Sequence, residues 1–422
     1  MKMRRCLAAL LLMPVLGFPA FTGDEAKKDD GFVPMFNGTD LTGWVNVNCA
    51  PGTFFVKDKQ IITTGRPTGY LRTDKQYENF IAEFDWMHVP PKKDAVGNSG
   101  FFVWADPIPA VGTGYTRGIE VQVLVNLHWI DKKSGLPTAT SHGDLFSIWG
   151  AKCVPDRPHP LGWERSIPSE NRAKGANEWN HYRVEGNNGV LTLAVNGKEV
   201  SKVSKCSPRK GYLALESEGS ECRFKNLKIK ELPSTNPKKE EIADVAEGHN
   251  SLYSGLDLSG WKADDEAKKH WHARDTVLHY DGKGEAKDNA LRTEKDFGSC
   301  EFIVDIRPPQ NGKRCSFGIL AAKDVALKLE LEPNGSYTVR GPTWSLESPD
   351  KGASGVKFGQ WNRLKMTATD KGMRQVFLNG NPLINPKSNS QSGPTEGKIV
   401  LAPEGAMDFA NLFVRELAEK KE

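Results

Sequence analysis

The sequence predicts an all-β protein built from two tandem sandwich domains of the jelly-roll kind. Short β-rich runs alternate with turn residues, and apolar positions with helical spacing are scarce. Some runs, such as Phe101 to Trp104 and Leu213 to Leu215, are apolar at every position, so both of their faces must be covered. Two sheets packed face to face meet that requirement. At 422 residues the chain is too long for one ordinary domain, and we expect two.

Internal repetition sets the domain organisation. The motif from Phe36 to Trp44 returns from Tyr253 to Trp261 with its glycines, its Asp-Leu pair and its Trp preserved. Further matches follow in the same order: Leu71-Arg72-Thr73 recurs as Leu291-Arg292-Thr293, Trp179-Asn180 as Trp361-Asn362, and Val195-Asn196-Gly197 as Leu378-Asn379-Gly380. We therefore expect a first domain at 32–232, a polar, proline-bearing linker at 233–250 and a second domain at 251–417.

Asn-Gly dipeptides in the first copy predict consecutive hairpins. Asn188-Gly189 and Asn196-Gly197 separate short β-rich runs, and both residue types tolerate the positive φ that two-residue hairpin turns require. The stretch from Tyr182 to Val200 is therefore expected to form an antiparallel meander.

The N-terminus, residues 1–23, has the layout of an export signal. Lys and Arg precede a short apolar run from Leu7 to Leu16, and a charged segment starts at Asp24. A buried N-terminal helix is the alternative interpretation. No later stretch has the roughly 18 consecutive apolar residues of a membrane span. We expect a secreted, periplasmic or cell-envelope protein without an integral span in the mature chain.

Charge and cysteine content narrow the possible partners. The 57 basic and 53 acidic residues are spread thinly, so no basic stripe is present to bind nucleic acid. Apart from Cys6 in the signal, six cysteines remain, an even number that could pair outside the cytoplasm. They are scattered without a Cys-x-x-Cys pair, so structural or free thiols are preferred to a thiolate zinc site.

The repeated blocks, together with Asn98-Ser99-Gly100, Gly118-Ile119-Glu120-Val121-Gln122 and Glu178-Trp179-Asn180, carry a resemblance to a known family. In the order and spacing of these blocks, residues 32–232 resemble the 3-keto-disaccharide hydrolase domain, and the second copy resembles it weakly. The resemblance implies two tandem concanavalin A-like jelly rolls and a carbohydrate or 3-keto-glycoside as the partner.

Glu120 is the first candidate for chemistry. It interrupts an apolar strand from Ile119 to Val125, and Gln122, two residues on, shares its face. On a concave sheet face the two side chains would supply a base and an amide that binds sugar hydroxyls. On an outer face both would only meet solvent.

Comparison of the two copies ranks the acidic candidates. Alignment puts Lys328 at the position of Glu120 and Ala402 at the position of Glu216, whereas the acid at Glu218 is repeated. Glu120 and Glu216 are therefore the candidate catalytic carboxyls, and Glu218 is expected to be a turn or structural residue. The second domain is expected to have lost the site.

Two further polar residues of the first copy could contact substrate. Arg72 could hold an oxyanion with its guanidinium fork. Arg292 recurs at the matching place in the second copy, which fits a structural ion pair equally well. Asn98 precedes an apolar strand, is not repeated, and could bind sugar hydroxyls.

The segment between Gln122 and Trp179 is much longer than its counterpart in the second copy, and long loops on rigid sandwiches often carry function. It contains His128 and His142, which could transfer protons or bind a metal, and Trp129, which could stack on a sugar. Ordinary packing is the alternative for all three. No metal-binding motif is present, and a divalent metal is only a possible cofactor.

The resemblance implies a glycoside already oxidised to a ketone at C3. Because the ketone acidifies the C2 hydrogen, a base could remove that proton, a cation could hold the enolate oxygen, and the glycosidic oxygen could leave from C1, with water added afterwards. We expect Glu120 as the base, Arg72 or a divalent metal as the cation, and Glu216 or a loop His as the acid.

Two other functions stay open at the level of sequence. Paired carboxylates could instead support ordinary glycoside hydrolysis. A non-catalytic carbohydrate-binding or cell-surface adhesion protein, with one groove on each sandwich, is the alternative from a different class.

Overall fold

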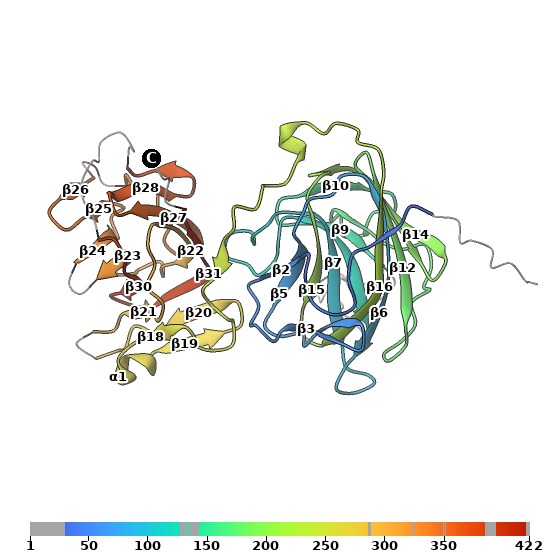
Figure 1. The fold of residues 1–422 in the computed structure, drawn as a ribbon, viewed down its shortest axis with the longest axis horizontal. Helices are drawn as coiled ribbons and strands as arrows, with labels where there is room; N and C mark the ends of the chain where they lie inside the picture. The colour runs from blue at the N-terminus through green and yellow to red at the C-terminus, as the bar shows by residue number, and fades with distance from the viewer. Residues whose placement is uncertain are drawn as a thin grey trace, which may run out of the picture.

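The computed structural model describes residues 30–126, 133, 135, 143–285, 288–322, 325–348, 350, 352–384 and 394–418. These residues form two lobes, the first built from strands β1 to β16 and the second from β17 to β31 (Figure 1). In the described part of the chain each lobe contains two antiparallel sheets. The predicted all-β fold with two jelly-roll sandwiches is confirmed.

The first lobe consists of a β6 sheet and a β8 sheet. The β6 sheet has the order β10-β14-β13-β12-β6-β16-β4-β3, with β1 pairing β16. Its strands are β1 (Val33–Pro34), β3 (Phe54–Lys57), β4 (Gln60–Thr63), β6 (Phe80–Val89), β10 (Lys152–Pro155), β12 (Asn180–Asn187), β13 (Val190–Val195), β14 (Lys198–Ser207) and β16 (Glu221–Glu231). The β8 sheet has the order β11-β9-β8-β7-β15-β5-β2. Its strands are β2 (Trp44–Val47), β5 (Gly69–Thr73), β7 (Gly97–Ala105), β8 (Gly118–Val125), β9 (Leu145–Ile148), β11 (Arg165–Ser166) and β15 (Tyr212–Ser217).

The second lobe repeats this plan with a β22 sheet and a β23 sheet. The β22 sheet has the order β19-β20-β31-β22-β27-β28-β29, with β17 pairing β31. Its strands are β17 (Asn250–Ser251), β19 (Trp271–Arg274), β20 (Val277–Tyr280), β22 (Cys300–Arg307), β27 (Asn362–Thr369), β28 (Gly372–Leu378), β29 (Asn381–Pro382) and β31 (Met407–Glu416). The β23 sheet has the order β18-β21-β30-β23-β24-β25-β26. Its strands are β18 (Trp261–Lys262), β21 (Leu291–Thr293), β23 (Cys315–Ala322), β24 (Val325–Leu331), β25 (Tyr337–Arg340), β26 (Ser345–Glu347) and β30 (Lys398–Pro403).

Burial along the strands shows where the first core lies. In β6 buried residues alternate with half-buried ones, so the β6 sheet has one face on the core and one toward water. In β8 all eight residues are buried, so both faces of the β8 sheet are covered. One face packs against aromatic residues of the β6 sheet, including Phe84, Trp86 and Tyr182. The other face carries the polar residues of the candidate site.

The repeated motif forms the same structure twice. The indole nitrogen of Trp44 donates a hydrogen bond to the carbonyl of Met35 (2.9 Å), and Trp261 donates in the same way to Leu252 (2.7 Å). Both Trp side chains are buried, and the glycine before each has a φ near +85°. The preserved glycines and tryptophans therefore serve the entry of the chain into each sandwich.

The predicted meander is confirmed in strands β12, β13 and β14. Its turns are Asn188-Gly189 and Asn196-Gly197, and all four residues have positive φ. This is the backbone that two-residue hairpin turns require.

The connection between the lobes follows the surface of the first lobe before it enters the second (Figure 1). It contains the 3-10 helix η1 (Lys239–Glu241), whose last residue accepts a hydrogen bond from the backbone of Arg209 (2.8 Å). Ala243 donates to the carbonyl of Lys210 (2.7 Å). The second lobe also contains one short helix, α1 (Asp265–Lys268).

Asp305 of β22 is a central residue of the contact between the lobes. It is fully buried and forms a bidentate ion pair with Arg363. It also accepts hydrogen bonds from the backbone of Gly112 (2.8 Å) and from Asn411 (2.6 Å). Because Gly112 belongs to the first lobe, this carboxylate ties the two lobes together.

The six cysteines in the described residues are all buried and free. Burial is the main reason that the pKa of each of these thiols is raised. The pairing that an even number of cysteines allows is therefore not formed among these six thiols. Within the same described ranges, no helix is long and apolar enough to cross a membrane.

Candidate functional site

Strand register brings the two predicted carboxyls together. Phe102 of β7 pairs with Glu120 of β8 and with Ala214 of β15. Two residues further along the same face, Gly100 lies between Gln122 and Glu216. Glu120, Gln122 and Glu216 therefore share the covered face of the β8 sheet.

Gly100 provides the space in which the carboxyls meet. A Cβ atom at this position would lie 2.9 Å from Oε2 of Glu216 and 3.0 Å from Oε1 of Glu120. Gly100 does not have a positive φ, so backbone strain does not require a glycine here. The side chains of Glu120 and Glu216 require it instead.

Burial changes the ionisation of both carboxyls. Glu216 is 1% exposed, and neither of its oxygens has a hydrogen-bond partner among the described residues. Burial, followed by the charges of Glu218 and Glu120, raises the pKa of Glu216 well above its ordinary value. The pKa of Glu120 is raised to about 8, mainly by burial and then by Glu218, against the opposing charge of Arg165. Burial therefore favours the protonated form of both carboxyls.

Glu218, which we expect to be a turn or structural residue, also belongs to this cluster. Its carboxylate accepts a hydrogen bond from the hydroxyl of Tyr115 (2.7 Å) and another from the amide of Asn98. Gln122 in turn donates to the amide oxygen of Asn98 (2.9 Å). Asn98 and Gln122 therefore lie beside the carboxyls. Asn98 binds Glu218 directly, and Gln122 binds Asn98.

Arg165 is the cation beside Glu120. Its guanidinium lies over the ring of Phe146 (3.9 Å to the centroid) and 3.8 Å from the carboxylate of Asp144, which is fully buried. Burial lowers the pKa of Arg165, whereas Asp144 and Glu120 raise it. Sequence patterns do not single out Arg165, because its strand β11 has only two residues.

Two aromatic rings lie beside the carboxyl cluster. Tyr115, which binds Glu218, is stacked on Trp149 with ring centroids 6.2 Å apart and planes 7° apart. Trp149 is 54% exposed and has a φ of 49°, which is uncommon for a bulky residue. Exposed flat rings of this kind can stack on sugars, and backbone strain is often retained at binding sites.

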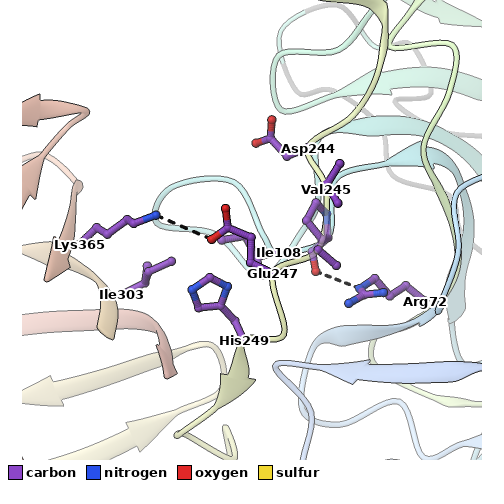
Figure 2. A pocket seen from close by; sticks show the side chains of 10 residues that line it. Arg72, Ile108, Asp244, Val245, Glu247, His249, Ile303 and Lys365 are labelled. Carbon is purple, nitrogen blue, oxygen red and sulfur yellow. Dashed lines mark hydrogen bonds and ion pairs between the residues drawn. The ribbon is translucent and has the colours of Figure 1, made fainter. Parts of the chain in front are cut away.

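Arg72 lies elsewhere. Its guanidinium donates to the carbonyls of Pro107 (3.2 Å) and Thr73 (2.8 Å) and lies over the ring of Tyr212. These contacts direct it to a cavity between the lobes rather than to the carboxyl cluster (Figure 2). Arg72 therefore does not lie beside Glu120. The cation beside Glu120 is Arg165 instead. His128, His142 and Trp129 lie outside the described residues.

The second lobe has none of the paired carboxyls at the matching positions. Lys328 pairs with Gly318, and Gly318 pairs with Val400, as Glu120 pairs with Phe102 and Phe102 with Ala214. The same register puts Ala402 at the place of Glu216. The alignment behind the prediction is therefore correct, and the second lobe lacks both carboxyls.

The described residues contain one group with metal-ligand spacing, and it lies at the contact between the lobes. Glu247, His249 and Glu301 each place a ligand atom within 4.8 Å of the others. Lys365 lies 3.0 Å from Glu301, and Arg415 lies 3.1 Å from Glu247. Because these cations already neutralise the carboxylates, we assign no metal here.

The fold is that of a tandem jelly-roll protein whose first lobe carries a cluster of buried carboxyls. The chain belongs to the family of 3-keto-alpha-glucoside-1,2-lyase-like domains, whose model matches residues 31–230 and 248–415. The predicted family is thereby confirmed, in both copies. No curated protein matches the chain.

Solved structures similar to this chain each cover about half of it or less. A provisionally assigned glycosyl hydrolase from Parabacteroides distasonis is 23% identical and has a TM-score of 0.38; the match covers 50% of this chain and 97% of that one. The carbohydrate-binding module CBM66 from Bacillus subtilis is 12% identical, with a TM-score of 0.33 and coverage of 47% and 99%. A β-glucanase from Bacillus licheniformis is 10% identical, with a TM-score of 0.28 and coverage of 38% and 94%. We base no function on these likenesses.

Proposed function

We propose that this protein cleaves 3-keto-glycosides by elimination at its first lobe. The observation that carries the proposal is the pair of buried carboxyls over Gly100, and burial raises the pKa of both. Groups whose environments push them into different protonation states at one pH supply the acid and the base of such a reaction. Membership of the lyase-like family supports the choice of a ketone substrate.

Glu120 acts as the base in this mechanism. In its ionised form it takes the proton from C2, which the ketone at C3 has made acidic. Its raised pKa makes it a stronger base than an exposed carboxylate, and it is still partly ionised at neutral pH. Arg165, whose charge acts on Glu120, stabilises the negative charge that develops on the C3 oxygen.

Glu216 acts as the acid. The electron pair of the enolate forms the C1–C2 double bond while the bond from C1 to the glycosidic oxygen breaks, and the protonated Glu216 gives its proton to that oxygen. Its oxygens have no hydrogen-bond partner among the described residues, so a described side chain does not compete with the substrate for its proton. Water then adds across the double bond and yields the free 3-keto sugar.

Turnover of matched substrates tests the proposal. The full chain would be incubated with a 3-keto-glycoside and with its unoxidised parent, with and without chelator, and the products followed by mass spectrometry. We expect cleavage of the ketone alone, and loss of cleavage in Glu120→Gln and in Glu216→Gln. Glu404→Gln is a suitable control because Glu404 pairs with Arg314 in the second lobe.

Three other outcomes would each replace the proposal. Cleavage of both sugars would indicate ordinary glycoside hydrolysis. Binding without cleavage would indicate a carbohydrate-binding protein, as the exposed ring of Trp149 would also allow. Loss of activity with chelator would move the role of enolate stabiliser from Arg165 to a metal.

We also propose that the protein is exported, on the layout of residues 1–23. Fractionation of the native host, followed by N-terminal sequencing of the mature protein, tests this. An uncleaved chain in the cytoplasmic fraction would contradict it.

A further inference from the structure

The cavity that Arg72 lines lies between the two lobes and is separate from the carboxyl cluster. It has a volume of about 260 Å³. Pro107 and Ile108 of the first lobe form one side, Ile303 and Lys365 of the second lobe form another, and the connection around Asp244 and Glu247 closes it. Figure 2 shows Arg72 and Lys365 reaching it from opposite sides.

Arg72 is a buried cation without a counterion. The residue is 6% exposed, yet in the described ranges no carboxylate forms an ion pair with it. Its Nε and Nη1 atoms donate to two backbone carbonyls, and no hydrogen bond from Nη2 to a described residue is found. Burial lowers the pKa of Arg72, against the smaller opposing effects of Tyr212, Tyr70 and the charge of Asp74.

The second copy shows that this is not a general property of the repeat. Arg292, at the matching position, pairs with Asp288 (2.7 Å) and is more exposed. Of the other charged residues at the cavity, Lys365 pairs with Glu301 and Glu247 pairs with Arg415, whereas no ion pair of Asp244 is found in the described ranges. Arg72 is therefore a buried cation at this cavity for which the described residues provide no ion-pair partner.

We propose that this cavity binds a small polyhydroxy carboxylate, such as a sugar acid, with its carboxylate on Arg72. The guanidinium favours a planar carboxylate partner. Asp244 and Glu247 on the wall accept hydrogen bonds from hydroxyl groups and repel a second negative charge, which disfavours a phosphate dianion. The volume is below that of pockets for drug-sized ligands and suits one sugar ring.

Titration calorimetry on the full chain tests the site with D-glucuronate as the probe, and with D-glucose, acetate and inorganic phosphate beside it. We expect glucuronate to bind more tightly than any of the others. Arg72→Gln should lower its affinity by about tenfold or more, because a charge-assisted hydrogen-bonded pair is lost. Arg292→Gln, which removes the paired arginine of the second copy, should leave the affinity unchanged.

A second variant guards against misfolding of Arg72→Gln. Asp244 lies on the exposed connection, so Asp244→Asn should fold normally and weaken glucuronate but not acetate. No binding of glucuronate, equal binding of glucose, or equal losses in Arg72→Gln and Arg292→Gln would each overturn the proposal. Cleavage of 3-keto-glycosides depends on Glu120, so this proposal can fail while the proposed function holds, and the reverse.

Discussion

At the scale of single residues, Gly100 determines how closely the two carboxyls approach each other. Its missing side chain leaves the space that Glu120 and Glu216 occupy. The second lobe has Ser316 at the matching place, where Lys328 and Ala402 replace the carboxyls and no such space is needed. The difference between the copies at this one position therefore follows from the presence of the site.

Gly100→Ala should abolish cleavage while the protein stays folded. The added methyl group would lie about 3 Å from both carboxyls, so one or both must move, whereas the backbone conformation suits alanine. We expect a loss of turnover of at least about a hundredfold, because small displacements of catalytic groups are costly. Gly52→Ala, where an added Cβ meets nothing within 4 Å, is the control and should retain full activity.

The acid limb of the pH profile should report Glu120. Because the base must be ionised, kcat/KM should rise with pH and level off above about 8, the pKa of Glu120. Glu218 is the charged group that raises this pKa most, so Glu218→Gln should move the limb to lower pH. A profile that is flat from pH 6 to 9, or one that Glu218→Gln leaves in place, would exclude Glu120 as the base.

The raised pKa of Glu120 also makes the free energy of unfolding depend on pH. A carboxyl that titrates at 4.5 when unfolded and at about 8 when folded holds its proton more tightly in the folded state. The free energy of unfolding should therefore fall as pH rises from about 4.5 to 8. Glu120→Gln should remove this part of the loss and make the protein more stable than the wild type at pH 9, as measured by urea unfolding. Equal slopes against pH for both proteins would contradict the assignment.

Sequence patterns indicate some residues of the candidate site and miss others. Glu120 and Gln122 stood out because they interrupt an apolar strand, and Glu216 because the second copy lacks it. Glu218 was discounted because its acid recurs, yet it completes the cluster. Tertiary packing determines that the guanidinium of Arg165, and not that of Arg72, lies beside Glu120. No local sequence pattern indicates this.

At the scale of elements, the loop from Asp106 to Arg117 connects the carboxyl cluster with the end of β9. The loop is closed at its base by a bidentate ion pair between Asp106 and Arg117. It carries Tyr115, which binds Glu218 on one side and stacks on Trp149 at the end of β9 on the other. One loop thereby joins the proposed chemistry to an exposed aromatic surface.

Trp149→Ala should weaken substrate binding more than it slows the chemistry. If the exposed ring stacks on the sugar, its loss should raise KM about three- to tenfold and leave kcat nearly unchanged. Trp179→Ala is the control, because Trp179 lies over Lys225 of the β6 sheet. Equal effects of the two variants, or a loss confined to kcat, would show that Trp149 has no part in binding.

Strands were predicted correctly where the residues of the turns between them determine the turn type. The two Asn-Gly turns fixed the meander of β12, β13 and β14, because positive φ at both turn residues restricts the hairpin type. The loop that carries Tyr115 has no such signal. Its conformation depends on contacts with the second lobe, which are distant in sequence.

At the scale of the whole molecule, the second lobe holds the loop that positions Tyr115. Asp305 accepts a hydrogen bond from the backbone of Gly112, and Asn411 donates to the carbonyls of Ala110 (3.1 Å) and Thr113 (3.0 Å). Arg363 donates to the carbonyl of Pro109 (2.8 Å). A lobe that lacks the paired carboxyls thus holds the loop that carries Tyr115.

Gly112→Ala should show whether contact of this loop with the second lobe affects activity, apart from any effect on stability. Gly112 has a φ of +73°, and an added Cβ would lie 2.1 Å from the ring of Trp361, so the loop must withdraw from the second lobe. Gly43→Ala imposes similar backbone strain, at a φ of +86°, with nothing within 4 Å. We expect both variants to lose stability in thermal unfolding, but only Gly112→Ala to lower kcat/KM for the 3-keto-glycoside, by about tenfold. If the two variants retain the same kcat/KM, the second lobe does not position Tyr115, and its contact with the first lobe serves cohesion alone.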